Sequence, residues 1–439
     1  LTAVESHELP LLSWGIVDGS FTQDEILTLL EAAEPTTDPE DLLDDLVDQG
    51  LIVEQGLTNT RYRTRMAETV RLAAGLRQWF HGKDWRTAKP LVSDIRFLSR
   101  PRLVPRRDIS SDSLIESIDE QTDRPLSDQR REILRSLLGG RQVSAFQARS
   151  TLRMLGTAGR DINRGTCITA GTGSGKTLAF YLGALSDLAA TPGSATPRLI
   201  ALYPRTELLR DQLKNLLKSL DALRSSTGIS LHLGVLYGAC PGNRHHAETQ
   251  NYLGWKQRDG GLECPIVDCL EADCDGKLLW PQGAGEDQIL VCESCDTKVT
   301  SLVFTRDRLE SQPPEILFTT TEMLNRNLGS GSMPRILVGD QDSGPAFLLL
   351  DEIHTYSGVH GAQVANLLRR WRNRLRHPVH IVGLSATLAD PLGFFSGLTG
   401  LSTAQMVIVT PVDTELEEVG REYFLALRGD PASQASLLS

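Results

Sequence analysis

The amino-acid sequence predicts an α/β protein whose main part is a parallel β-sheet covered by helices. Two observations favour this class. From about residue 131 onward, continuous apolar runs alternate with amphipathic helical patterns, and such runs suit strands that are buried on both faces. In addition, the glycine-rich stretch "AGTGSGKT" (170–177) lies between an apolar run and a helical pattern. The order of strand, glycine loop and helix is typical of a phosphate-binding unit.

The strand candidates of this part are the apolar segments "TCITA" (166–170), "RLIALYP" (198–204), "EILFTT" (315–320), "AFLLLDE" (346–352) and "VHIVGLSAT" (379–387). We expect one domain over 131–410. A segment of different composition, from about 241 to 300, interrupts it and holds most of the cysteines.

The first 130 residues are organised differently. Residues 1–80 are predicted to form a mostly helical accessory module, in which leucines recur at helical spacing before two short strands, "GLIVEQG" and "RYRTR". Helices followed by a strand pair are the layout of a winged helix, although any small α+β module fits as well. Residues 81–130 are rich in proline, arginine and serine with little periodicity, which indicates a basic linker that wraps a neighbour.

Charge is unevenly distributed along the chain. The formal net charge of −11 argues against strong nonspecific binding to nucleic acid. However, residues 31–50 carry eight carboxylates and no lysine or arginine, whereas residues 61–107 carry thirteen basic and three acidic residues. This asymmetry permits a basic groove, and solvated helix faces explain it equally well. No apolar run has the length of a membrane helix and no signal peptide is recognisable, so we expect a cytoplasmic protein without a membrane partner.

The glycine loop is predicted to bind the phosphates of a nucleotide. Its glycines let the backbone amides turn toward one phosphate group, at the positive end of the following helix. Lys176 is expected to reach the β- and γ-phosphates, and the Thr177 hydroxyl to hold Mg²⁺. The loop begins with Ala170 where the strict pattern has glycine. The predicted loop residues are Ala170, Gly171, Thr172, Gly173, Ser174, Gly175, Lys176 and Thr177.

A pair of acidic residues is the expected second half of this site. Asp351 and Glu352 follow the apolar run of "FLLLDEIH". Asp351 is predicted to bind Mg²⁺ through water, and Glu352 to take a proton from the attacking water as a general base. An isolated Asp-Glu pair after a strand is common. Together with the glycine loop it is informative, because both features must meet at the carboxyl edge of one parallel sheet.

With these motifs the chain resembles superfamily 2 helicases of the DEAD/DEAH-box type. "SAFQARS" contains Gln147 at the position where these proteins keep an adenine-reading glutamine. "LYPRTELLRDQ" and "FTTTEML" look like segments that contact the nucleic-acid backbone, and "GLSATL" looks like the segment that couples ATP state to the bound strand. The resemblance implies the first RecA-like motor lobe, with ATP, Mg²⁺ and nucleic acid as its ligands.

The resemblance carries over to individual residues. The implied nucleic-acid contacts are Arg205, Thr206, Thr320 and Thr321, and the implied coupling residues are His354, Ser385, Ala386 and Thr387. A motor that moves on any sequence must hold phosphates and leave base edges unread, and these side chains have the required chemistry. Hydroxyls that follow strands are equally often ordinary helix caps.

The stretch "DEIHTYSGVHGAQVANLLRRWRNRLRH" is similar to the MrfA/YprA group of bacterial DNA helicases and to the large helicases of anti-phage systems such as Druantia and DISARM. The likeness implies 3′-to-5′ movement on single-stranded or partly duplex DNA, in phage defence or DNA repair, with other defence-system proteins as partners. Within this stretch, residues 364–375 form an apolar stripe that ends in an arginine run. Such a run is more often a solvated face than a DNA contact.

The insert is predicted to bind a structural zinc ion. Its cysteines are Cys264, Cys269, Cys274, Cys292 and Cys295, and their spacing is typical of a zinc ribbon. Four ligands are needed, and the sequence does not decide which of Cys264, Cys269 and Cys274 is spare. An iron–sulfur cluster and free buried thiols are the alternatives. The segment offers few other ways to build a core, so we expect metal binding to supply its folding energy.

The combined reading is an ATP-dependent DNA helicase or translocase. Because the chain starts with Leu1 and residues 411–439 look like the start of a second lobe, we expect the amino-terminal part of a longer protein. Without that second lobe the chain should bind ATP but hydrolyse it poorly. An ATP-gated DNA-binding clamp that never translocates is the first alternative, and a different phosphate-loop enzyme, a kinase or GTPase, is the second.

Overall fold

The computed structural model describes residues 1–439 with the exception of 57–58, 78–80, 83, 123–124, 156–161, 172, 192, 194, 250–251, 284–287, 331–332, 387 and 430–439. The chain forms two compact units, which are described separately. One comprises Leu1–Leu103 with Glu418–Ser439, and the other comprises Val104–Glu417.

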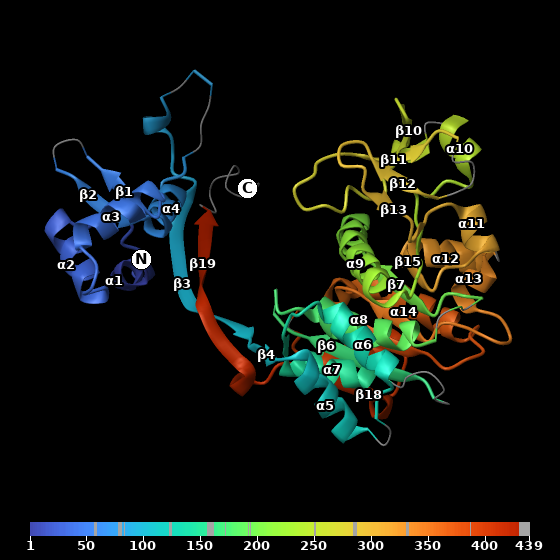
Figure 1. Cartoon of the computed structure of the whole chain (residues 1–439). Coiled ribbons are helices and arrows are strands. Elements are labelled where there is room, and N and C mark those ends of the chain that lie inside the picture. The colour runs from blue at the N-terminus through green and yellow to red at the C-terminus, as the bar shows by residue number, and fades with distance from the viewer. Residues whose placement is uncertain are drawn as a thin grey trace. The chain divides into compact units, whose positions relative to one another are not determined.

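The larger unit is built on an eight-stranded sheet (Figure 1). In spatial order its strands are β14 (Leu302–Val303), β8 (Leu233–Leu236), β15 (Ile316–Thr320), β7 (Leu199–Tyr203), β16 (Phe347–Leu350), β17 (His380–Ser385), β6 (Arg164–Thr169) and β18 (Met406–Val409). All neighbouring pairs are parallel. The predicted fold class and all five strand candidates are therefore confirmed. The strands that the sequence did not reveal, β14, β8 and β18, lie at the two ends of the sheet.

Helices surround this sheet. They are α5 (Ser111–Gln121), α6 (Asp128–Leu138), α7 (Ala145–Met154), α8 (Lys176–Ala189), α9 (Thr206–Thr227), α11 (Arg306–Ser311), α12 (Thr321–Ser330), α13 (Pro334–Val338), α14 (Gly358–Arg372) and α15 (Pro391–Thr399). Helix α6 packs against α8 and α9, α7 packs against α8, and α14 packs against α12 and α15. A short antiparallel pair, β4 (Arg107–Ile109) and β5 (Val143–Ser144), precedes α7. The core is continuous through these elements, because apolar strands and the inner faces of the helices bury one another.

Part of the arginine run at the end of α14 contacts neighbouring helices. Arg369 and Arg372 donate hydrogen bonds to the carbonyl oxygens of Gly397 and Thr399 in α15, at 2.8 and 2.9 Å. Arg374 donates to a carbonyl oxygen at the end of α12, at 2.8 Å. These guanidinium groups satisfy carbonyls at helix ends, which lack intrahelical partners. Arg369 and Arg372 thus contact α15, whereas Arg370, Arg374 and Arg376 are exposed.

The insert forms a five-stranded antiparallel sheet of β9 (Lys256–Arg258), β10 (Gly261–Glu263), β11 (Leu278–Pro281), β12 (Leu290–Cys292) and β13 (Lys298–Val299), preceded by α10 (Arg244–Thr249). Trp255 and Trp280 are fully buried and pack on Phe304, with ring centroids 5.5 and 4.9 Å from it. The expectation that this segment has few means of building a core was wrong. Its aromatic side chains join the core of the lobe.

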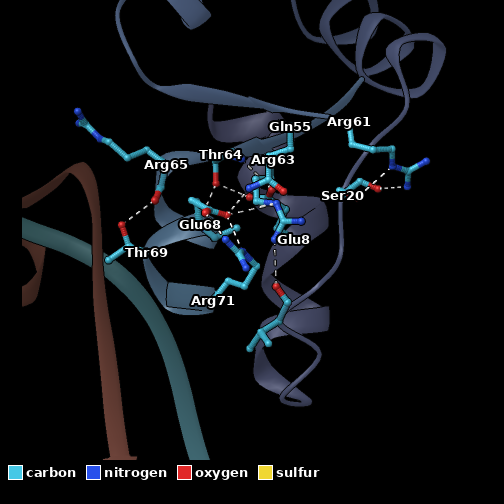
Figure 2. A network of polar contacts seen from close by, with 12 residues as sticks. Glu8, Ser20, Gln55, Arg61, Arg63, Thr64, Arg65, Glu68, Thr69 and Arg71 are labelled. Carbon is cyan, nitrogen blue, oxygen red and sulfur yellow. Dashed lines mark hydrogen bonds and ion pairs between the residues drawn. The ribbon is translucent and has the colours of Figure 1, made fainter. Parts of the chain in front are cut away.

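The smaller unit begins with α1 (Thr2–Ser13), α2 (Gln23–Ala33), α3 (Pro39–Asp48), the antiparallel pair β1 (Ile52–Gln55) and β2 (Arg61–Thr64), and α4 (Arg65–Ala74). This order of helices and strand pair agrees with the winged-helix-like layout that the sequence indicates. Buried Glu8 of α1 accepts hydrogen bonds from both the amide and the hydroxyl of Thr64, the N-cap residue of α4 (Figure 2). Glu68 beside it binds Arg71 and Arg63. Polar contacts thus tie α1 to the hairpin.

Two of the expected segments contain regular secondary structure. The segment 81–130, expected as a linker, contains β3 (Val92–Pro105), β4 and α5, and α5 buries Leu114, Ile115 and Ile118 in the core of the larger unit. The segment 411–439 contains β19 (Leu416–Gly429), which pairs with β3, and its assignment to the start of a second lobe stays a prediction. Strand pairing between distant segments leaves no local signal in the sequence, which is why the pattern did not reveal it. Among the described residues, none of the helices has both the length and the apolar character needed to span a membrane.

Candidate nucleotide site and cysteine cluster

The glycine loop connects β6 to α8. Gly175 is the N-cap residue of α8 and has a φ of 85°, in the left-handed region that favours glycine. No side chain caps this helix. The amides of its first turn therefore remain available to an anion, which the positive end of the helix attracts. The sequence produces this geometry by placing glycines between a buried strand and a helix that is buried over most of its length.

Lys176 folds back over the loop. Its ammonium nitrogen donates to the carbonyl oxygens of Ala170 and Gly171, at 2.9 and 3.2 Å. Burial lowers the pKa of Lys176, while the negative charges of Glu352 and Asp351 oppose that shift. The ammonium group thus lies within electrostatic reach of both carboxylates. The loop and the acidic pair, 175 residues apart at Lys176 and Asp351, meet at the same edge of the sheet.

Asp351 follows the last residue of β16 and is 7% exposed. Burial and the adjacent charge of Glu352 raise the pKa of Asp351 to about 6, against the effects of the Glu352 amide, Lys176 and His354. A buried carboxylate beside a second one carries an electrostatic cost that a cation relieves. Oxygen ligands are also those that Mg²⁺ prefers. The residues present therefore fit a Mg²⁺ site, with Asp351 and the half-buried hydroxyl of Thr177 as its donors.

Glu352 is connected through His354 to β17, the strand beside β16 in the sheet. It has a φ of 46° at the start of the short 3₁₀ turn Ile353–Thr355, an uncommon backbone conformation for a non-glycine residue. Its carboxylate lies 3.2 Å from Nδ1 of His354, which lies 3.4 Å from the hydroxyl of Ser385 at the end of β17. Polar contacts thus run from the proposed general base to the segment expected to couple ATP state to the bound strand.

The remaining expected loop and coupling residues are placed as follows. Ser174 is buried and its hydroxyl donates to the carbonyl of Gly171 at 2.7 Å, which closes the turn. Gly171 and Gly173 are exposed, and Ala386 is half-buried beyond β17. Thr172 and Thr387 lie outside the described residues.

Gln147 is fully buried in the first turn of α7. Its side-chain oxygen accepts from the amide of Ser144 at 2.9 Å, and its side-chain nitrogen donates to the carbonyl of Gly175 at 3.0 Å. The side chain therefore both caps α7 and holds the glycine loop. The adenine-reading role that the resemblance implies stays a prediction.

The four expected nucleic-acid contacts lie at strand-to-helix turns. Arg205 is exposed immediately before α9, and the Thr206 hydroxyl donates to its neighbour Glu207. The Thr320 hydroxyl accepts from the amide of Met323 at 3.3 Å, as an ordinary cap does, and Thr321 is half-buried at the start of α12. Arg205 is thus the residue whose exposure best suits a phosphate contact.

The cysteine cluster resolves the open question of the spare thiol. The sulfur atoms of Cys269, Cys274, Cys292 and Cys295 all lie within 4.8 Å of one another. Cys264 is instead buried nearby in the core, where burial raises the pKa of its thiol to about 12 and the amides of Ile266 and Val267 donate to it. Cys264 is therefore the spare cysteine.

The geometry of the cluster fits a tetrahedral metal. The sulfur atoms of Cys269 and Cys295 are 3.5 Å apart, and those of Cys274 and Cys292 are 3.6 Å apart. Ligands at the Zn–S distance in a tetrahedron lie about 3.8 Å from one another, whereas a disulfide requires about 2.0 Å. The amide of Gly276 also donates to the sulfur of Cys274, at 3.4 Å. These four cysteines could hold zinc, with the amide as an outer hydrogen bond to a ligand.

A cavity beside the glycine loop was not expected from the sequence. It has a volume of about 520 Å³ and lies among α6, α8 and α9, with Gly175 and Thr177 on its wall. Arg107 of β4 also lines it, and its guanidinium donates to the carbonyl of Gly173 at 3.4 Å. Arg107 comes from the segment expected as a linker, and the pairing of β4 with β5 helps to bring it to the loop.

A parallel sheet with a glycine loop and an acidic pair at its carboxyl edge is typical of P-loop nucleotide-binding proteins. Residues 144–252 match the DEAD/DEAH box helicase family. This match agrees with the resemblance to DEAD/DEAH-box helicases that the motifs of the sequence indicate.

One curated relative is the Druantia protein DruE of Escherichia coli (strain UMEA 4076-1), 27% identical over 54% of this chain. The aligned part spans only 16% of the length of that relative. Among solved structures, the DUF1998 helicase MrfA bound to DNA and AMPPNP is 20% identical, covers 76% of this chain and 34% of its own, and has a TM-score of 0.43. Mss116p bound to single-stranded RNA and AMP-PNP is 13% identical, covers 70% and 47%, and has a TM-score of 0.42.

Proposed function

We propose that this chain is the ATP-binding lobe of a DNA helicase or translocase, which hydrolyses ATP to move along DNA in the 3′-to-5′ direction. The observation that carries the proposal is the convergence of Lys176, Asp351 and Glu352 at one sheet edge. The matched helicase family supports the class of activity. DNA as the track, and phage defence or repair as the setting, rest on the likeness to DruE and MrfA.

Each residue of the site has its own role in the proposed hydrolysis of ATP. The amides of the glycine loop and the Lys176 ammonium hold the β- and γ-phosphates, and Lys176 must leave the carbonyls of Ala170 and Gly171 to do so. Asp351 and Thr177 would hold Mg²⁺, which would neutralise phosphate charge. The Glu352 carboxylate accepts a proton from the attacking water. His354 lies between Glu352 and Ser385 and couples ATP hydrolysis to the segment on the nucleic-acid side.

A Lys176→Ala substitution tests the proposal. It removes the cation that faces the phosphates, so we expect ATP turnover by the complete protein to fall by about two orders of magnitude or more. The fold should remain, because the Lys176 side chain binds only carbonyls of its own loop. DNA-stimulated phosphate release measures the effect, and circular dichroism checks the fold. Unchanged turnover in a folded variant would remove this loop from the mechanism.

An ATP-gated clamp is the second candidate. It would bind DNA when ATP is bound, without turnover or movement. The presence of Glu352 at the site argues for turnover, since a clamp needs no general base. Displacement of a labelled strand by the complete protein separates the two functions, because a clamp binds DNA in an ATP-dependent manner and displaces nothing.

A further inference from the structure

Exposed arginines gather where α12 and α14 pack against each other (Figure 1). Arg370 of α14 donates to the side-chain oxygen of Asn325 in α12, at 3.2 Å. Arg374 donates to the carbonyl oxygen of Leu328, near the end of α12, at 2.8 Å. The residue after Asn325 in α12 and the second residue after Arg374 are also exposed arginines. These four residues form the arginine surface: Arg326, Arg370, Arg374 and Arg376.

The positive charge of the arginine surface is not neutralised by carboxylates. Within the described part of the chain, Arg326 and Arg376 have no hydrogen-bond or ion-pair partner, and Arg370 and Arg374 bind only uncharged oxygen atoms. A guanidinium group has five N–H donors, so both of the latter keep unused donors. Their contacts with α12 already order the side chains, which reduces the entropy that a ligand would cost on binding. The chemistry of this surface therefore suits an anionic ligand.

The arginine surface lies toward the amino edge of the large sheet, away from the nucleotide site. Helix α14 begins after the carboxyl end of β16 and ends at Arg372, and the chain then enters β17 at His380. Because β16 and β17 are parallel, the start of β17 lies at the amino edge. Helix α12 likewise runs away from Thr320, the carboxyl end of β15. The expected nucleic-acid contacts at strand-to-helix turns are at the opposite edge, so the arginine surface is separate from them.

The composition of the arginine surface favours the phosphate backbone of a duplex. Protein interfaces are centred on apolar or aromatic anchors, and single-strand sites stack bases on aromatic rings. Trp371 of α14 is fully buried, and the exposed large apolar side chain among the described residues of α12 and α14 is Val359, in the first turn of α14. The surface thus offers guanidinium groups alone. Their donors match phosphate oxygens in pairs.

We propose that the arginine surface binds the phosphate backbone of duplex DNA, as a second DNA contact outside the track of the motor. The inference rests on the proposed function for the choice of DNA as the ligand. The contact is independent of base sequence, because phosphates carry no sequence information. It contributes to DNA affinity and leaves the carboxyl edge of the sheet free for the translocating strand.

The salt dependence of duplex binding tests the proposal. A labelled blunt-ended DNA duplex is titrated with the full chain, without nucleotide, at several salt concentrations. Each phosphate contact contributes about 0.9 to the slope of log affinity against log salt concentration. Arg326→Ala/Arg376→Ala should therefore lower the slope by about 2 and weaken binding about tenfold at low salt. The matched control, Lys218→Ala/Lys298→Ala, removes the same charge from exposed positions on α9 and β13 and should leave the slope unchanged.

Three results of this titration would overturn the proposal: no binding of the duplex by the wild type, an unchanged slope in Arg326→Ala/Arg376→Ala, or an equal loss of slope in the lysine control. If the arginine variant keeps duplex binding but loses affinity for polyglutamate, the surface binds an acidic protein instead. If circular dichroism shows that the variant is misfolded, Arg370→Gln decides, because glutamine still donates to Asn325. Its slope should fall by about 1, and an unchanged slope rejects the duplex contact.

ATP turnover separates this inference from the proposed function. Phosphate release stimulated by single-stranded DNA should be equal in the complete wild-type protein and in Arg326→Ala/Arg376→Ala, because these arginines lie away from the nucleotide site. A variant that loses turnover while its duplex binding keeps the wild-type slope would show that the arginines belong to the motor track, against the proposal. A wild type without DNA-stimulated turnover would remove the proposed function, whereas the loss of slope would still establish the duplex contact.

Discussion

The carboxyl group of Glu8 is buried in the smaller unit, where its neighbours only partly offset the cost of burying a negative charge. It is 3% exposed, and its pKa is raised by burial more than the hydrogen bonds of Thr64 lower it. The fold therefore favours the protonated form. The contribution of Glu8 to stability is fully present below its ordinary pKa of 4.5 and is lost as the pH rises through the raised value.

A Glu8→Gln variant should reveal this effect. Glutamine keeps the shape and the acceptor for the Thr64 amide but never ionises. We expect the variant and the wild type to have similar stability near pH 4, and the variant to be the more stable near pH 7, by about 1.4 kcal/mol for each unit of the pKa shift. Urea unfolding of the amino-terminal unit at both pH values measures the difference. If the difference in unfolding free energy between the variant and the wild type did not change with pH, the pKa of Glu8 would not be shifted by the fold.

The contact between α7 and α8 shows how one element positions another. A Cβ atom at Gly183 in α8 would lie 2.7 Å from the Thr151 carbonyl oxygen and 2.6 Å from the Met154 Cβ atom of α7. The absence of a side chain at Gly183 thus lets α7 approach closely, and α7 carries Gln147, which contacts Gly175 in the loop. The position of the glycine loop depends in part on this helix crossing.

Gly183→Ala should therefore destabilise the larger unit by about 1–3 kcal/mol, through overpacking at the crossing. Gly397→Ala is the matched control. That glycine is also helical, in α15, and a Cβ atom there would meet nothing within 4 Å, so alanine should be neutral or stabilising by up to about 1 kcal/mol. Thermal unfolding compares the two. If both substitutions changed the thermal stability equally, close packing of α7 against Gly183 would not be the cause.

From the cysteine cluster we predict the metal content of the protein. We expect about one zinc ion per chain, since four thiolates complete one tetrahedral site. Cys292→Ser should lose the metal, whereas Cys264→Ser should retain it, because Cys264 lies outside the cluster. Elemental analysis of the purified variants checks this. Iron in place of zinc would favour the cluster alternative, and the absence of metal from the wild type would defeat the ribbon interpretation.

Removal of the metal should destabilise the insert while the large sheet of the lobe stays folded. Trp255 and Trp280 pack on Phe304, so the insert is anchored to the lobe by apolar contacts as well as by metal. We expect a chelator to expose the amides of β11 and β12 to hydrogen exchange while the protection of β6 and β16 is unchanged. Binding of inorganic tripolyphosphate by the glycine loop should survive as well. Loss of protection throughout the large sheet would show that zinc carries the folding energy of the entire lobe.

Local sequence determined the central elements of this protein. The strands β6, β7, β15, β16 and β17, the glycine loop and the acidic pair were all predicted, because continuous apolar runs and glycine spacing are local patterns. The rule that parallel strands end at one edge then predicted that Lys176 and Asp351 meet. The chemistry of the phosphate site is therefore encoded in short segments and in their order along the chain.

Tertiary structure alone decided the contacts between segments that are far apart in sequence. It brought four of the five cysteines together, since a candidate metal site depends on where sulfur atoms meet and not on spacing. It also turned Arg369 and Arg372 of α14 toward carbonyls, engaged Gln147 on both sides, and brought Arg107 to the glycine loop. Each of these outcomes depends on pairing and packing between remote segments, for which the sequence of either partner carries no local signal.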